Sequence, residues 1–509
     1  MKKIILYFSV FIWALAMGSC SDVLETAPPT RPSEATFWKT QSDYEKALAA
    51  CYTVIGQSSN SRLSCFMQAY DCMTDNAYRG SGGTGDYSTE YYVTGLLNPT
   101  STGHVTELYM EAYRAIARIN IFMHQLELAE NTGITDDGKK NMMAEAYFLR
   151  GYCYWMLYLF YGEVPVVTEP LTIENQVQPK KSRVEVYEHA IADLQYAIDN
   201  FTQDQTYKQA GGHATKGAAR GLKARMLMFN AFDANGSAIR AEIEKAYNEL
   251  NLITGYSLNP EYSYNFYPDM QEASPEIIFS IKYLSPNSYH DNDRIFGLDN
   301  GMYPTQDFFD AFSPGDTRRL KTFAEERTHT WIGRPTVTFP ESTTRYGYRR
   351  PIKGVSPLPL PSGDEIWGKE DRADYDAIIL RWGELMLLKA EAAVELDLLS
   401  VAKDLVDQIR DRQTTLPHLP DGLSQAQMRD SVRHERRVEA GYESGLRYYD
   451  LKRWGTMEQR LKETFANDPD FSNLRPTWTK ATHYDLPLPQ AEIDKSNGVL
   501  IQNPIYTNR

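Results

Sequence analysis

The sequence predicts a mainly α-helical fold of paired helices, interrupted by one long loop-rich region. Outside residues 255–373, apolar residues recur at spacings of three and four, which is the period of a helix with one buried face. Alanine and glycine recur where neighbouring helices would touch, as in tetratricopeptide-like helix pairs, although no 34-residue repeat is present. Between residues 255 and 373 this period fades, and Pro, Gly, Tyr and Asn become frequent. Loops this long within a compact chain usually serve a function.

The N-terminus predicts export and attachment to a membrane. A basic start, an apolar run over Ile4–Met17 and the small pair Gly18-Ser19 form a signal peptide over residues 1–19, too short to span a bilayer. Cys20, at the expected cleavage point, is what a bacterial lipoprotein needs, since its thiol and freed amine carry the acyl chains that hold the protein on a membrane. The alternative is an ordinary secretory signal cut elsewhere, such as after Ala16. A polar leader begins at residue 21.

Amphipathic or apolar periodicity predicts nine main helices. Their expected ranges are Ser42–Ile55, Val105–Leu128, Lys140–Tyr161, Arg183–Asn200, Thr215–Phe232, Ala241–Ile253, Ile378–Leu396, Ser400–Arg412 and Gln425–Tyr442. A turn is expected at Asp136–Gly138, and the helix that follows is apolar almost all round, so it should lie centrally. Short strands are expected at Ile277–Ile281 and Thr336–Phe339. The C-terminus, Asp485–Tyr506, is expected to be extended.

Composition and charge exclude several classes of partner. The 509-residue chain carries a net charge of −14, which becomes −16 once Lys2 and Lys3 are removed with the signal. So acidic a chain does not predict a nucleic-acid partner. No apolar run after the signal is long enough for a transmembrane helix. Cysteines are few, and an oxidising compartment permits a bridge among Cys51, Cys65 and Cys72 without requiring one.

Several segments together resemble the SusD/RagB family of outer-membrane nutrient-binding lipoproteins. They are AEAYFLRGYCYWMLYLFYGEVPVV at 144–167, HERRVEAGYESGLRYYDLKRWG at 434–455, LPLPQAEID at 486–494 and QNPIY at 502–506. The resemblance implies an α/α superhelix of four tetratricopeptide-like helix pairs with a loop-rich ligand-binding part. It covers an N-terminal region, 20–230, and a C-terminal region, 231–509, that contains loop segment 255–373.

The same resemblance implies a location, a partner and a ligand class. The protein would face outward from the outer membrane, anchored at Cys20, and act as a hinged lid on a SusC-type TonB-dependent transporter. Its ligands would be nutrient glycans; the alternative is binding and uptake of peptides by the same lid mechanism. The resemblance implies no enzymatic activity and no cofactor.

Local motifs for catalysis or metal binding are incomplete. His434-Glu435 begins like the zinc-protease HExxH motif, but Val438 replaces the second histidine. Asp291-Asn292-Asp293 lacks the glutamate that closes a calcium loop, so no metal site is predicted. We expect the alternating charges of the C-terminal block to form a structural ion-pair network instead, involving Glu435, Arg436, Arg437, Glu439, Arg447, Asp450 and Arg453.

Aromatic residues in loops are the predicted ligand contacts, because Trp and Tyr rings stack on the flat C–H faces of sugars while polar side chains bind the hydroxyls. Two loop regions contain them, 75–92 and 283–331. The candidate residues are Tyr78, Tyr87, Tyr289, Asn292, Arg294 and Trp331. We expect Trp331, Tyr289 and Tyr78 to form the floor of a shallow aromatic platform; a peptide-binding lid would instead enclose a polar cavity. Several arginines cluster between residues 318 and 353, so the sequence does not exclude an acidic glycan as the ligand.

Overall fold

The structure is a computed structural model of the chain. It describes residues 37–56, 70–79, 88–101, 103–283, 302–326, 328–330, 332, 334, 336–338, 349–353, 375–412, 415–469 and 476–507.

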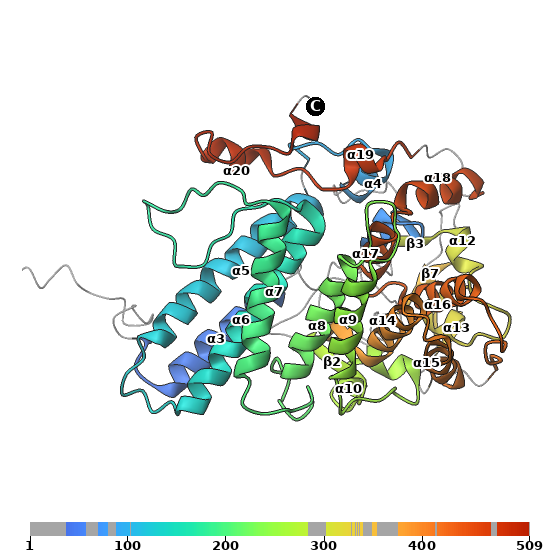
Figure 1. The fold of residues 1–509 in the computed structure, drawn as a ribbon, viewed down its shortest axis with the longest axis horizontal. Helices are drawn as coiled ribbons and strands as arrows, with labels where there is room; N and C mark the ends of the chain where they lie inside the picture. The colour runs from blue at the N-terminus through green and yellow to red at the C-terminus, as the bar shows by residue number, and fades with distance from the viewer. Residues whose placement is uncertain are drawn as a thin grey trace, which may run out of the picture.

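Paired helices form the frame, as the sequence predicts. Their observed bounds are α3 Gln41–Gly56, α5 His104–Glu127, α6 Asp136–Tyr161, α7 Arg183–Asn200, α8 Lys216–Phe229, α9 Arg240–Asn251, α14 Trp382–Glu395, α15 Leu399–Asp411 and α16 Gln425–Ala440. Chain neighbours pack against each other, α6 on α7, α8 on α9 and α14 on α15, and α5 to α9 stand side by side (Figure 1). Helix α14 also packs on α9, so the array continues across the loop-rich region.

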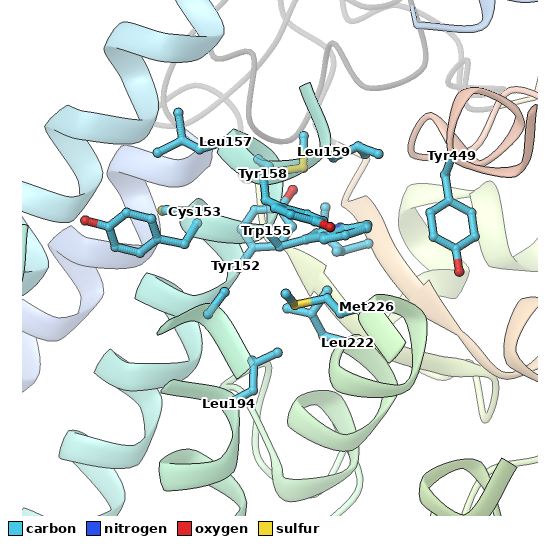
Figure 2. Close-up of a cluster of buried hydrophobic side chains, with 14 of the residues drawn as sticks. Tyr152, Cys153, Trp155, Leu157, Tyr158, Leu159, Leu194, Leu222, Met226 and Tyr449 are labelled. Atoms are coloured by element: carbon cyan, nitrogen blue, oxygen red, sulfur yellow. The ribbon is translucent and has the colours of Figure 1, made fainter. Parts of the chain in front are cut away.

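Helix α6 is the centre of the main core. Every residue from Met142 to Tyr161 is buried except Tyr147, as its nearly uniform apolar composition predicts. Trp155 lies beside Leu222 and Met226 of α8 and faces Tyr449 (Figure 2). The predicted turn at Asp136–Gly138 is wrong: Thr135 accepts a hydrogen bond from the Gly138 amide, and this cap makes these residues the first turn of the helix.

A second difference lies at the start of α14. The sequence predicts one helix over Ile378–Leu396, but residues Ala377–Arg381 form strand β8, which pairs antiparallel with β2, Ile277–Ile281. The apolar, β-branched run AIILR suits a buried strand, and a short apolar run of this kind cannot be told from a helix by periodicity. Strand β2 agrees with its predicted bounds.

Short elements fill the described parts of the loop-rich region. Three further two-stranded ladders are present: β1 Ala77–Arg79 with β3 Met302–Pro304, β4 Phe323–Ala324 with β7 Arg350–Pro351, and β5 Thr328–Thr330 with β6 Thr336–Thr338. The other elements are η3 Tyr262–Phe266, α10 Pro268–Gln271, α12 Gln306–Phe309 and α13 Arg318–Thr322. Apart from the exposed β5–β6 ladder, these elements surround a second hydrophobic core that includes Ala77, Tyr267, Met302, Phe308, Phe323 and Tyr442.

The remaining helices are shorter: α4 Ser88–Thr94, α17 Leu446–Arg453, α18 Met457–Asn467, α19 Lys480–His483, α20 Gln490–Lys495 and η4 Pro504–Tyr506. The C-terminal arm, predicted to be extended, therefore contains one α-helical and one 3-10 segment; it crosses the upper end of the helix array (Figure 1). None of the described helices is long and apolar enough to cross a membrane. Cys51 and Cys72 are buried thiols that are not bonded to each other, and Cys65 lies outside the described residues.

Candidate functional site

The ladder of β1 and β3 brings together the two loop regions that the sequence predicts to bind ligand. Tyr78 pairs with Tyr303, and Arg79, the last residue of β1, pairs with Met302, the first residue of β3. Residues 80–87 follow β1 and residues 284–301 precede β3. Because the strands are antiparallel, the first segment leaves the ladder and the second enters it at the same end.

Of the predicted contact residues, only Tyr78 is described. Tyr87, Tyr289, Asn292, Arg294 and Trp331 lie outside the described residues. The side chain of Tyr78 is 7% exposed, belongs to the main core, and its ring packs edge-on against Phe465 at 6.2 Å. This burial gives Tyr78 a packing role at the base of the loops. The sequence placed it in a loop because the strand is short and its partner lies more than 200 residues away.

The hairpin of β5 and β6, whose connecting residues include Trp331, is linked to the second core through Arg334. Strands β5 and β6 flank residues 331–335, and the Thr330 and Thr336 hydroxyls are 2.6 Å apart across the ladder. Arg334 Nη2 donates to Asp269 Oδ2 at 2.6 Å, and its guanidinium lies over the Tyr267 ring. Since Tyr267 packs in the second core with Ala77 and Met302, Arg334 links the hairpin to the core that also holds β1 and β3.

A cleft of about 1030 Å³ opens beside these bases. Its walls come from α12, α16, α17 and α18, and its lining includes Asp307, Asp310, Arg433, His434, Arg437, Arg447, Trp454, Gln459, Arg460, Glu463, Asn467 and Asp468. It adjoins the loop bases because α12 follows β3 directly and Phe465 of α18 touches Tyr78. Walls rich in amides, carboxylates and guanidinium groups suit a ligand with many hydroxyl groups.

Fixed charges dominate the floor of the cleft. The buried Asp75 accepts hydrogen bonds from Arg447 Nε and Nη2, each at 2.7 Å, and from Arg460 Nε at 2.8 Å. Burial alone would raise the pKa of Asp75, but the charges of Arg437 and Arg447 outweigh it and hold the pKa well below its usual range. Asp75 therefore stays ionised near neutral pH, and both of its carboxylate oxygens are bonded to arginines, which gives it a structural role.

Arg433 is the cleft residue with the most capacity for a ligand. Its guanidinium lies 4.4 Å from the Trp454 ring centroid, and its buried Nε has no hydrogen-bond partner. Within the described part of the chain it forms no ion pair with a carboxylate. The charge pattern of residues 434–453 does not include this residue, although its position one turn before Arg436 and Arg437 on α16 places it on the same side of the helix as that pair.

The predicted charge network in the C-terminal block is confirmed as structural. Glu439 accepts hydrogen bonds from Arg318 Nη1 at 2.9 Å and Arg381 Nη1 at 2.7 Å, and it also pairs with Arg412. Arg436 Nη2 and Arg453 Nη2 both bind Asp450, at 3.1 Å and 2.8 Å. These side chains are almost fully buried, so they hold elements together and are not accessible to a substrate. Within the described ranges, no cluster of His, Cys, Asp or Glu is arranged to hold a metal ion.

Two family models match the chain and together span nearly all of it. One, described as the SusD family, matches residues 187–506, and the other, described as starch-binding and associating with the outer membrane, matches residues 24–228. These matches confirm the SusD/RagB resemblance seen in the sequence motifs. The second description is that of a binding protein, and neither description names a catalytic activity.

Curated and solved relatives agree with that assignment. A SusD-like protein, P38, of Formosa agariphila is 25% identical over 89% of this chain and 91% of its own length. A SusD-like carbohydrate-binding protein of Bacteroides fragilis has the same fold, with a TM-score of 0.74 at 20% identity over 91% of this chain and 99% of that one. Surface glycan-binding protein A of Bacteroides thetaiotaomicron, solved with laminarihexaose, gives 0.72 at 20% identity over 91% and 100%. These likenesses confirm the mainly helical fold.

Proposed function

Because the chain belongs to the SusD family, we propose that it binds nutrient glycans at the cell surface and acts as the lid of a SusC-type TonB-dependent transporter. The observation that carries the proposal is the common base of the candidate loops. The β1–β3 ladder contributes Ala77 and Met302 to the second core, beside a polar cleft of about 1030 Å³, and Arg334 joins the β5–β6 hairpin to Tyr267 of the same core. Loops that carry Tyr and Trp next to such a cleft have the chemistry that a sugar chain requires.

The glycan class is supported by the names of similar proteins. The proteins of similar fold include one solved in complex with laminarihexaose and another described as laminarin-binding. For this chain we propose that Trp331 and Tyr289 stack on sugar rings, with Tyr87, Asn292 and Arg294 as polar or aromatic contacts. Tyr78, which is buried on the β1–β3 ladder, would support the loops from the core.

Binding of the mature, soluble Cys20→Ser protein to a panel of neutral and acidic polysaccharides and to peptide mixtures tests this function. We expect a glycan to bind, and its affinity, measured by calorimetry, to fall at least tenfold in Trp331→Ala. The matched control is Ile332→Ala, since Ile332 is the exposed neighbour on the same hairpin and should leave the affinity within twofold. Binding of peptides alone would favour the peptide-uptake alternative, and equal affinities of the two variants would remove Trp331 from the site.

We further propose that Cys20 carries the lipid anchor and that the protein faces outward from the outer membrane. The motif around Cys20 and the description of the N-terminal family model support this location. Replacing Cys20 by Ala should leave glycan affinity unchanged in solution and abolish uptake of the glycan by cells. Uptake at the wild-type rate would show that a lipid is not what holds the protein to its transporter.

A further inference from the structure

Two hollows adjoin along the exposed face of α5. The first, about 700 Å³, is lined by Phe37 and Trp38 together with residues of α3 and residues of α5 from Glu111 to Phe122. The second, about 640 Å³, is lined by the first half of α5, by the loop at 165–178 and by residues 492–500 around α20. Arg114 and Ala117 line both hollows, so the two form one groove, which we name the α5 groove.

The α5 groove combines apolar walls with a basic rim. Ile121, Leu171 and Val177 line it and are each more than a third exposed, which is costly for a surface that nothing covers. Its charged lining residues are Lys46, Arg114, Arg118 and Lys495 against Glu111 and Glu492, an excess of two positive charges. This local excess contrasts with the net charge of the whole chain, −14. The groove therefore favours an occupant that is partly apolar and acidic.

The segment of this chain that precedes Phe37 has that chemistry. Residues 21–36 read SDVLETAPPTRPSEAT, with three carboxylates and one arginine, a net charge of −2 that is opposite to that of the groove. Val23-Leu24 and Pro28-Pro29 supply apolar groups. Proline-rich segments prefer an extended conformation, and aromatic-lined grooves bind such segments at low entropic cost. Tyr109 and Tyr113 provide aromatic rings in the second hollow.

The length of segment 21–36 and the position of Phe37 also fit the α5 groove. The described chain begins at Phe37, which itself lines the first hollow. From Ile121 to Tyr109 the groove follows α5 for about 18 Å, at 1.5 Å per residue. An extended chain covers about 3 Å per residue, so Pro28 and Pro29 lie about 25 Å from Phe37, far enough to reach the second hollow.

From the groove's chemistry and the position of Phe37, we propose that residues 21–36 lie in the α5 groove as an extended segment, with Pro28-Pro29 in the second hollow. Residues 21–36 are then bound along α5 rather than extended into solvent, and Cys20 lies near α20. If Cys20 is lipidated, as proposed above, docking shortens the tether and fixes the side of the molecule on which the anchor lies. The docking itself depends neither on lipidation nor on a glycan ligand.

Photo-crosslinking in the full-length protein in its own membrane tests the docking. A benzophenone amino acid at position 30, next to Pro29, should crosslink to residues 109–117 or 165–178 of the same chain, as mapped by mass spectrometry. Crosslinks to a second copy of the chain, to another protein or to other parts of this chain would overturn the proposal. Absence of crosslinks would overturn it as well.

Variants of the groove provide matched controls. Ala117→Arg places a long charged side chain where the two hollows meet and should reduce the crosslink yield at least fivefold. It should also speed cleavage after Glu34 by a glutamate-specific protease about tenfold. Ala491→Arg, on an exposed part of α20 that does not line the groove, should change neither.

Lys46→Glu, a surface charge reversal at the rim, should reduce the yield about threefold even if Ala117→Arg folds poorly. Yields unchanged in both groove variants would overturn the docking, while glycan affinity, measured separately, reports on the proposed function.

Discussion

Two clusters of arginines and carboxylates meet on helix α16 and differ in their access to solvent. The closed cluster comprises Arg318, Arg381, Arg412, Glu276, Glu439 and Glu443, and no side chain in it is more than 6% exposed. The open cluster comprises Arg437, Arg447, Arg460, Asp75 and Asp307, and it borders the candidate cleft, where Asp307 is 38% exposed and Arg460 is 28% exposed. Arg437 and Glu439 are only two positions apart on α16, yet Arg437 belongs to the cluster that borders the cleft and Glu439 to the cluster that is closed to solvent.

The closed cluster joins the loop-rich region to the helical frame. Arg381, the last residue of β8, donates to Glu276, Glu439 and Glu443 at 2.6–2.7 Å, and these carboxylates lie before β2, on α16 and just after α16. Burial alone would raise the pKa of Glu439, but the charges of Arg412 and Arg381 outweigh it and hold the pKa well below its usual range. Ion pairs in this position fix the arrangement of the elements that they connect.

The open cluster has a buried half and an accessible half. Asp75 is fully buried and saturated by arginines, whereas Asp307 and Arg460 reach the cleft. In this chain, therefore, a charged motif does not by itself indicate a binding role. Whether its members support the fold or are accessible to a ligand depends on which side of α16 they occupy.

The largest effect is expected where the closed cluster is broken. Glu439→Gln removes the charge that Arg318, Arg381 and Arg412 share, leaving buried guanidinium groups undercompensated, which typically costs about 3–5 kcal/mol. Denaturant unfolding of the soluble mature protein measures this loss. Glu463→Gln, at a side chain that is 49% exposed on α18, serves as the control and should change stability by less than about 0.5 kcal/mol. A loss below 1 kcal/mol for Glu439→Gln would mean that the closed cluster does not stabilise the fold.

Asp71 lies near Lys353 and Arg447, and its ionisation should make the free energy of unfolding depend on pH. Burial raises its pKa from 3.8 to about 7, even though its Oδ2 accepts a hydrogen bond from the Tyr442 amide and Lys353 and Arg447 are near. A carboxyl with a raised pKa in the folded state contributes stability below pH 4 that is lost as the pH rises through 7.

Asp71→Asn, which cannot ionise, should remove this loss. At about 1.4 kcal/mol per pH unit over the two units from pH 5 to the folded pKa near 7, the wild type should lose roughly 3 kcal/mol more than the variant between pH 5 and pH 8. Unfolding curves of both proteins across this range measure the difference. Parallel pH profiles would show that Asp71 ionises normally in the folded protein.

The helical frame could be predicted because its signal is local. Arg183–Asn200 has the predicted bounds, and α5, α8 and α16 differ from their predictions by only a few residues at either end. Apolar periodicity and capping residues such as Ser182 lie within the segment that they organise. The prediction is wrong where two elements share one apolar run, as at β8 and α14.

The candidate site could be predicted only in part, because its geometry depends on contacts distant in sequence. The loop regions were identified by composition, yet nothing in the sequence shows that Tyr78 pairs with Tyr303 or that Asp75 meets Arg437, Arg447 and Arg460. Alternating charges around residues 434–453 predicted a network but not its division into a closed and an open part. That division follows from how α16 packs, which only the tertiary structure reveals.

The smallest effect on stability is expected from the accessible edge of the open cluster. Arg460→Gln removes one of three arginines from Asp75, but Arg437 and Arg447 remain, and Arg460 is partly in water, so the loss should be about 1 kcal/mol or less. If the proposed glycan site extends into the cleft, the same variant should weaken glycan binding several-fold, as measured by calorimetry.

The buried counterpart, Arg447→Gln, should lose more stability, since it removes a two-point hydrogen bond to a buried carboxylate. Equal losses from the two variants would show that the cluster is not divided by solvent access, and that the cleft edge is as structural as its floor.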